Sequence, residues 1–211
     1  MKLIFVGAQG CGKGTQAKIV AERLGLCHIS SGDALRKVTG NGSQVTGLGA
    51  EVKSYMDDGK LVPDELIVRI LKERIAEADC EKGFILDGFP RNLSQALELD
   101  KITEIDKVIE IFISDELSVR RISGRMGCED CGAIYNVNGT PKPVIEGKCD
   151  KCGGELLQRA DDNESALRER LKVYHEETMK VLEHYGAVRV DGEQDIERVT
   201  RAVLEAIGVR G

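Results

Sequence analysis

Tryptophan is absent from the 211-residue sequence, and only four phenylalanines, four tyrosines and three histidines are present. No apolar run approaches the ~20 residues that a membrane-spanning helix needs. The N-terminus also lacks the charged, apolar and cleavage regions of a signal peptide. The formal charge of −6 and the lack of basic patches with interleaved aromatics argue against a nucleic-acid partner. We therefore expect a soluble, cytoplasmic protein without a membrane or nucleic-acid partner.

A convincing Ser–His–Asp set is also absent. The three histidines, His28, His175 and His184, share no motif, and we expect each to be a surface or packing residue. The hydrophobic content of 41% and the charged content of 31% are typical of a globular protein. The length suffices for one well-cored domain with a small inserted one.

Short apolar runs alternate with segments of helical periodicity. The expected strands are 2–7, 26–30, 83–88, 107–114 and 187–192, and the expected helices are 13–25, 64–78, 115–126 and 195–208. The strands are rich in β-branched residues and bounded by Gly, Asp or Ser, as in parallel strands buried on both faces. This alternation predicts a doubly wound α/β sheet. A further apolar helix face is expected from Leu167 to Tyr185.

The alternation stops from about Gly127 to Leu157, where no helical or strand period of useful length is found. Glycine, proline and cysteine are frequent there. A structureless loop of that length is improbable in a compact domain, so we expect a small inserted subdomain.

The segment GAQGCGKGTQ, Gly7 to Gln16, follows the first expected strand and opens the first expected helix. Its glycines allow successive backbone N–H groups to point into one concavity, and Lys13 can reach the outer phosphates of a nucleoside triphosphate. The hydroxyl residue stands at Thr15, one position later than in the general motif, because Gly14 follows the lysine. The alternative is an ordinary glycine-rich turn between strand and helix.

Four of the seven cysteines form two Cys-x2-Cys pairs, Cys128 with Cys131 and Cys149 with Cys152. In a reducing compartment this spacing predicts a tetrahedral Zn²⁺ site of four thiolates, which would be structural because no histidine or open position accompanies it. Reducible disulfides, a redox site or an Fe–S centre are the alternatives. Cys11, Cys27 and Cys80 are expected to be passive.

Asp87 ends the expected strand 83–88, so its carboxylate emerges where α/β sheets bind ligands. It could hold waters of a Mg²⁺ ion there, or it could simply cap a turn. Without further context, Arg36 could be a solvated helix residue and Ser31 a helix cap.

Taken together, several segments resemble adenylate kinases and other nucleoside monophosphate kinases over the whole chain. The segments are GAQGCGKGTQA, HISSGDALR from His28, GKLVPDELI from Gly59, GFILDGFPRNLSQA from Gly83, RRISGRM from Arg120, QRADDNESALRERL from Gln158 and VDGEQ from Val190. The cysteine insert lies where the lid of the long, zinc-bearing form of adenylate kinase belongs. The resemblance implies a P-loop core of 1–126 and 161–211, with five parallel strands and an AMP-binding helical segment at about 30–62, and a zinc-binding lid at 127–160.

The resemblance also implies reversible, Mg²⁺-dependent transfer of a phosphoryl group, ATP + AMP = 2 ADP, by a monomer. The residues implied to act on the transferring group are Lys13, Arg91, Arg125, Arg159 and Arg170. The implied ATP site contains Gly10, Cys11, Gly12, Lys13, Gly14, Thr15, Arg121, Arg125, Ile134, Tyr135 and Gln194. The implied AMP site contains Ser31, Arg36, Lys60, Leu61, Val62, Gly88, Phe89, Pro90, Arg91, Gln95, Arg159 and Arg170. Asp161 and Asp162 are implied to act in lid closure.

Three positions depart from the family pattern: Gln9 stands where the family usually has proline, Ser31 where it has threonine, and Met126 where many members have a second arginine. Other hypotheses are a nucleoside monophosphate kinase of different specificity (GTP:AMP or UMP/CMP), a GTPase- or ATPase-type switch, and a zinc-ribbon nucleic-acid binder. Ser31 and Gln95 argue for AMP, and the long lid argues against the UMP/CMP type. A switch would need Lys-Ser/Thr in the loop and a guanine-reading element, which the sequence lacks.

Overall fold

The computed structural model describes residues 1–39, 52–55, 58, 60–159 and 162–209. Its centre is a parallel sheet with the strand order β2-β3-β1-β4-β8. The strands are β1 (Lys2–Val6), β2 (Cys27–Ser30), β3 (Phe84–Asp87), β4 (Lys107–Phe112) and β8 (Val188–Asp191). All five lie within the predicted apolar runs, which confirms the predicted five-stranded sheet.

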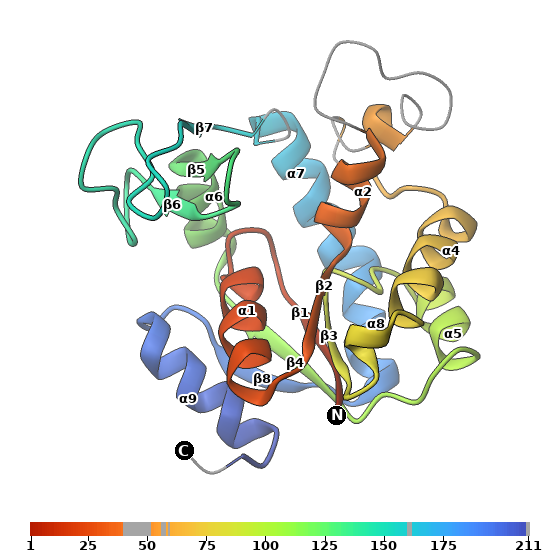
Figure 1. Cartoon of the computed structure of the whole chain (residues 1–211). Coiled ribbons are helices and arrows are strands. Elements are labelled where there is room, and N and C mark those ends of the chain that lie inside the picture. Colours follow the sequence, from red (N-terminus) through yellow and green to blue (C-terminus); the bar gives the residue numbers. More distant parts are fainter. Residues whose placement is uncertain (40–51, 56–57, 59, 160–161, 210–211) are drawn as a thin grey trace.

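Helices cover both faces of the sheet (Figure 1). They are α1 (Lys13–Leu24), α2 (Ser31–Thr39), α4 (Asp64–Ile75), α5 (Leu93–Asp100), α6 (Asp115–Ser123), α7 (Glu164–Val173), α8 (Met179–Tyr185) and α9 (Ile196–Ala206), with a 3-10 turn η1 (Ala78–Cys80) and a π-helical turn η2 (Tyr174–Thr178). Residues alternate along β1 between the two cores: Leu3 and Phe5 pack with α1 and α9, whereas Ile4 and Val6 join the core with α4, α5 and α8. The sheet is therefore doubly wound, as predicted.

Two helices end three residues earlier than predicted, and the insert contains strands that were not predicted. The helix expected over 64–78 ends at Ile75. The helix expected over 115–126 ends at Ser123, and Arg125 already belongs to a strand. The insert, for which no strand was expected, contains an antiparallel sheet in the order β6-β5-β7, formed by β5 (Arg125–Cys128), β6 (Ile134–Asn136) and β7 (Leu156–Leu157). These strands are two to four residues long, which is too short for a period-2 pattern to be visible in the sequence.

Cys27 and Cys80 lie together outside the insert, beside Arg74. The guanidinium donates to both sulfurs, at 3.0 Å to Cys27 and 3.1 Å to Cys80, and forms an ion pair with Asp79. Burial raises the pKa of Cys27 to about 12, so this thiol stays protonated near neutral pH. A packing role agrees with the expectation for these cysteines.

The parallel sheet determines where a ligand can bind. Because its strands run in one direction, β1, β2 and β3 all end at the same edge. At this edge begin α2, Gly88 and the loop 7–12, which is the predicted phosphate loop. The insert stands above this edge (Figure 1). Among the described helices, none is long and apolar enough to cross a bilayer.

Candidate active site

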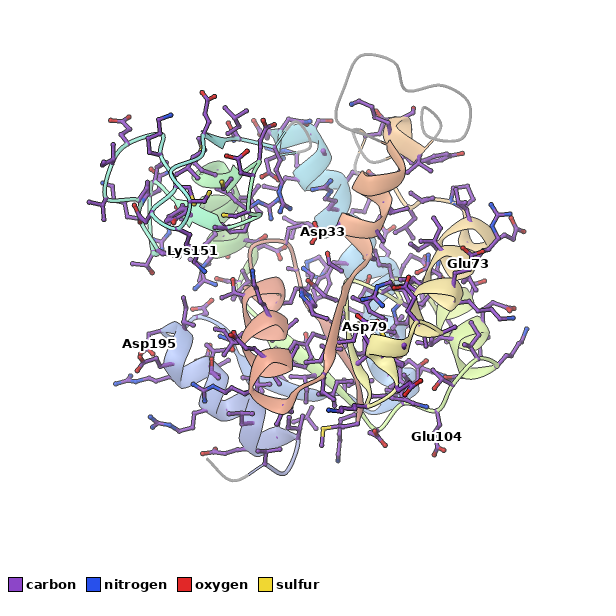
Figure 2. All side chains as sticks on the ribbon, in the orientation of Figure 1. Asp33, Glu73, Asp79, Glu104, Lys151 and Asp195 are labelled. Atoms are coloured by element: carbon purple, nitrogen blue, oxygen red, sulfur yellow. The ribbon has the colours of Figure 1, made fainter. Side chains whose placement is uncertain are left out.

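A large cavity of about 1830 Å³, the main cavity, opens at the carboxyl edge of the sheet. It is lined by the phosphate loop, the start of α2, the β3–α5 loop, α6, the insert, α7 and the start of α9. Asp33 on α2 and Lys151 of the insert, both labelled in Figure 2, are among the residues that line it. Pockets for one small ligand usually measure about 300–1,000 Å³, so this cavity has room for two ligands of that size.

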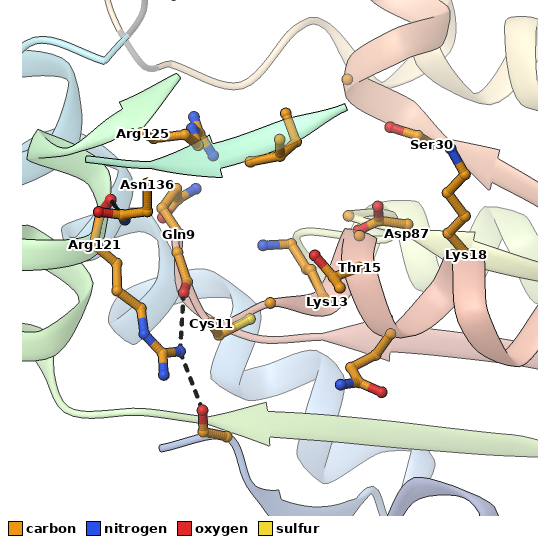
Figure 3. Close-up of a pocket in the computed structure, with 18 of the residues that line it drawn as sticks. Gln9, Cys11, Lys13, Thr15, Lys18, Ser30, Asp87, Arg121, Arg125 and Asn136 are labelled. Carbon is orange, nitrogen blue, oxygen red and sulfur yellow. Dashed lines mark hydrogen bonds between the residues drawn. The ribbon is translucent and has the colours of Figure 1, made fainter. Parts of the chain in front are cut away.

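The phosphate loop connects β1 to α1 and forms the floor of the main cavity (Figure 3). Gly10 and Gly12 have φ angles of 75° and 93°, which residues with a Cβ rarely adopt. Lys13 is the first residue of α1, and its Nζ donates to the carbonyl oxygen of Ala8 at 3.2 Å, across the loop. The loop therefore presents a lysine and a helix N-terminus to the cavity, which suits bound phosphate.

Asp87 explains why glycine follows the lysine. A Cβ on Gly14 would lie 3.0 Å from Asp87 Oδ2, so a larger residue would press on the carboxylate. The same carboxylate oxygen lies 3.4 Å from His28 Nε2. His28 lines the main cavity beside Asp87, so the prediction that it is only a surface or packing residue missed its position. His175 and His184 instead lie within hydrogen-bonding distance of Asp115 and Asp100 at partly exposed positions, as expected for surface residues.

Gly88 is the centre of a second polar group. Ser31 Oγ and Arg91 Nε each donate to the Gly88 carbonyl oxygen at 2.8 Å. A Cβ on Gly88 would lie 3.0 Å from Ser31 Oγ and 3.9 Å from Lys13 Cε. Ser31, Arg91 and Lys13 thus converge on one glycine, although they come from α2, the β3–α5 loop and α1.

Gln95, buried on α5, is hydrogen-bonded to the β3–α5 loop that contains Arg91. Its Oε1 accepts the backbone N–H of Arg91 at 2.8 Å, and its Nε2 donates to Asp64 Oδ1 at 2.8 Å. Asn92 caps α5 and donates to the same carboxylate. Asp64, at the start of α4, therefore ties the wall of the cavity to α5.

The other side of the main cavity carries arginines from α6, β5 and α7. Arg121 Nη1 donates to the carbonyl oxygens of Gly10 at 3.2 Å and Gly192 at 3.1 Å (Figure 3). Arg125 Nε donates to Asp162 Oδ2 at 2.7 Å, and its Nη2 pairs with Oδ1 of the same carboxylate. Arg170 Nη1 lies 4.0 Å from Asp162 Oδ1. The side chain of Asp162 is fully buried between these two arginines.

The four insert cysteines form a compact cluster in which all Sγ atoms lie within 4.8 Å of one another. Cys128 Sγ is 3.4 Å from Cys152 Sγ, and Cys131 Sγ is 3.5 Å from Cys149 Sγ. A disulfide would need about 2.05 Å, whereas a tetrahedron with Zn–S bonds of about 2.3 Å has edges of about 3.8 Å. The cluster is therefore compatible with a structural Zn²⁺ ion. The hydroxyl of Tyr135 lies 3.6 Å from Cys149 Sγ and accepts the N–H of Asp150.

Comparison with known proteins identifies the family. The family model described as adenylate kinase matches residues 5–190. An adenylate kinase of Caldicellulosiruptor bescii is 46% identical over 218 residues, covering 99% of this chain and 100% of the relative. An adenylate kinase of Archaeoglobus fulgidus is 48% identical, covering 98% and 99% of the two chains. A third, from Thermodesulfovibrio yellowstonii, is 49% identical over 88% and 86%.

The chain belongs to the adenylate kinase family.

The structure brings most of the adenylate kinase residues predicted from sequence to the main cavity. The predicted residues that line it are Gly10, Cys11, Gly12, Lys13, Gly14, Thr15, Ser31, Lys60, Leu61, Val62, Asp87, Gly88, Phe89, Arg91, Gln95, Arg121, Arg125, Ile134, Tyr135, Arg159, Arg170 and Gln194. Pro90 instead lines a second cavity of about 30 Å³ behind the phosphate loop, which we call the small cavity. The side chain of Arg36 and residue Asp161 are outside the described residues.

Sequence reasoning missed several polar residues of the same adenylate kinase cavity. They include His28, Ser30, Asn136, Asn138, Arg198 and Arg201. His28 stands in a quoted motif, but nothing in the sequence indicates that β2 and β3 pair so that it faces Asp87. Asn136 and Asn138 follow no motif and could not have been found from the sequence.

Removal of the Asp162 carboxylate should destabilise this adenylate kinase fold. In Asp162→Ala, Arg125 and Arg170 would remain partly buried without their shared partner. Loss of one member of a buried ion pair costs about 3–5 kcal/mol, which corresponds to a melting temperature lower by roughly 6–20 °C in a chain of this size. Thermal unfolding followed by circular dichroism measures this. Glu164→Ala, which removes an exposed pair with Arg168, is the control and should shift the melting temperature by less than about 2 °C. An equal shift in both variants would contradict the prediction.

Proposed function

We propose that the protein transfers the γ-phosphoryl group of MgATP to AMP, giving two molecules of ADP in a reversible reaction. The observation that carries the proposal is that the main cavity is lined both by the phosphate loop and by the polar group of Ser31 and Arg91 around Gly88. The names of the relatives support the same reaction, and the alternative of a different donor or acceptor is not favoured.

The two nucleotides would occupy the two sides of the main cavity. The phosphates of ATP would lie on the phosphate loop, with Arg121 and Arg125 on the outer side. The base of ATP would lie near Gln194, beneath Ile134 and Tyr135. AMP would bind opposite, between Ser31, Leu61 and Val62, with its phosphate on Arg36 and Arg91. In this arrangement Gln95 acts through the Arg91 loop, because both ends of its amide are bonded within the protein.

The chemistry needs little beyond position and charge. The bond between the γ-phosphorus of ATP and its bridging oxygen breaks, with the electron pair leaving on ADP, and a bond forms to an oxygen of the AMP phosphate. That phosphate is already an anion at neutral pH, so no general base is required. Lys13, Arg91, Arg125, Arg159 and Arg170 would align the two polyanions and stabilise the charge of the moving group. Arginine suits this task because its planar fork binds phosphate bidentately.

The donors near the phosphate loop fit a magnesium ion. Asp87 and Thr15 supply oxygen atoms to the main cavity, and Mg²⁺ prefers few carboxylates with retained waters. When bound with ATP, Mg²⁺ neutralises phosphate charge. The four insert cysteines would hold Zn²⁺ in a purely structural role, keeping the insert a rigid body.

Residues 127–160 would act as a lid that closes over ATP, so that water cannot accept the phosphoryl group. Arg125 and Asp162 lie where the lid joins the core 1–126 and 161–211, so their ion pair would rearrange when the arginine turns to phosphate. The proposal includes a monomeric, cytoplasmic enzyme.

The test is ADP formation from MgATP with AMP, GMP, CMP and UMP in turn, followed by GTP in place of ATP. We expect fast turnover only with ATP and AMP. Equal or faster turnover with GTP as donor would establish the GTP:AMP alternative. Tight ATP binding without turnover on any acceptor would refute the proposed kinase activity.

A further inference from the structure

Gln9 lies in the phosphate loop, between Ala8 and Gly10. Its backbone is fixed by α6, because the buried Ser118 Oγ donates to the Gln9 carbonyl oxygen at 2.6 Å. The next residue is equally constrained: a Cβ on Gly10 would lie 3.2 Å from Arg121 Cβ. The side chain of Gln9 therefore starts from a well-defined point.

Gln9 is a wall residue of both cavities. The small cavity lies between the phosphate loop, the β3–α5 loop and α7. Lys13, Arg91 and Arg170 also line it. These are three of the five cations that we propose for the moving phosphoryl group. In Figure 3 the side chain of Gln9 extends from the loop into the main cavity on the side of Arg125. Gln9 thus lies among the charges that converge on the reaction.

The amide oxygen of Gln9 is buried and accepts no hydrogen bond from the residues that the structure describes. Buried polar atoms of this kind are rare in folded proteins, because burial removes their bonds to water. A half-turn of the amide exchanges its oxygen and nitrogen, so either end can face a ligand. The amide is therefore available to a group that enters the main cavity.

We propose that Gln9 is a further catalytic residue, whose side-chain amide donates a hydrogen bond to the phosphoryl group during transfer while its oxygen accepts from a neighbouring guanidinium. The inference rests on the proposed function. In transfer, charge is spread over the three equatorial oxygens of the phosphoryl group, and a neutral donor held in place by the loop stabilises this charge without reorganisation. The amide transfers no proton.

Gln9→Met tests the inference, because methionine has similar length but lacks the amide. We expect kcat to fall about tenfold or more, while the KM values for ATP and AMP change by less than about threefold. The reason is that the loss of an interaction made only in the transition state lowers kcat and leaves ground-state binding unchanged. Gln9→Glu, which places negative charge at the same point, should lower kcat further. Calorimetric binding of AMP with MgADP and aluminium fluoride, a mimic of the planar phosphoryl group, should weaken in Gln9→Met by a similar factor.

Gln158→Met is the matched control. It makes the same substitution at an exposed glutamine that lines neither the main cavity nor the small cavity. We expect it to leave kcat within about twofold of the unsubstituted protein.

An unchanged kcat for transfer to AMP in Gln9→Met would overturn the role of Gln9. If ATP hydrolysis without AMP fell in the same variant, the amide would instead be assigned to orienting water. If the unsubstituted protein transferred no phosphoryl group at all, the proposed function would fail instead.

Discussion

Lys13→Met should lower kcat by about a thousandfold or more while the fold stays intact. The Nζ of Lys13 stands at the floor of the main cavity and points across a loop whose glycines leave room for phosphate. A single charged group on a transferring phosphoryl is worth about 10³–10⁵ in kcat, and methionine keeps the length of the side chain without the charge. Steady-state ADP formation measures the loss.

The fold should survive because, among the residues that the structure describes, the Lys13 ammonium group makes one hydrogen bond, to the carbonyl oxygen of Ala8. We expect the melting temperature of Lys13→Met to stay within about 3 °C of the unsubstituted protein, since one such bond contributes about 1 kcal/mol. Lys101→Met is the matched control, since this exposed lysine directly after α5 pairs with Glu98 and does not line the main cavity, and it should keep full activity. A kcat within tenfold of normal in Lys13→Met would show that the loop does not hold the reacting phosphates.

Cys149→Ser should remove the metal from the insert and lower the melting temperature by at least about 6–12 °C. The insert core consists of a few residues, of which Cys128 and Cys149 are themselves members, so little apolar burial remains to hold three short strands together. Structural zinc contributes its binding free energy to folding, and a loss of about 3 kcal/mol corresponds to that shift in a chain of this size. Zinc content by mass spectrometry of metals and thermal unfolding measure the two effects.

Cys27→Ser separates the metal effect from the loss of a buried thiol in general. Cys27 lies beside Arg74 and far from the insert in the chain, and serine can still accept the guanidinium hydrogen bond. We expect this control to keep about one zinc per chain. If Cys149→Ser kept its zinc and its melting temperature, the cluster would not be a structural metal site.

Several features of this protein were readable from local sequence. The buried strands of β1, β3 and β4 appear as continuous apolar runs because both of their faces meet helices. The phosphate loop is visible because its backbone angles require glycine at defined positions. The cysteine pairs are visible because a metal needs its ligands at short, regular spacing. In each case the physical constraint acts on residues that are close together in the chain.

Other features depend on neighbours that only the folded chain provides. Gln95 owes its orientation to Asp64, 31 residues earlier, and Arg125 lies against a carboxylate 37 residues later. The π-helical turn at Tyr174–Thr178 interrupts what reads as one continuous apolar helix face. There Thr178 Oγ1 donates to the Arg91 carbonyl oxygen and the Tyr174 hydroxyl donates to the buried Glu110. No pattern in the sequence marks these partners.

The sequence by itself determined the family, the doubly wound sheet, the phosphate loop and the four-cysteine cluster, because periodicity, glycine and ligand spacing are local requirements. Only the tertiary structure decided that His28 faces Asp87, that Asp162 is buried between two arginines, and that the amide of Gln9 lies among the cations of the phosphate site. These arrangements arise where parallel strands end together and distant loops meet. Their free energy comes from contacts between segments that are far apart in the chain, which local patterns do not record.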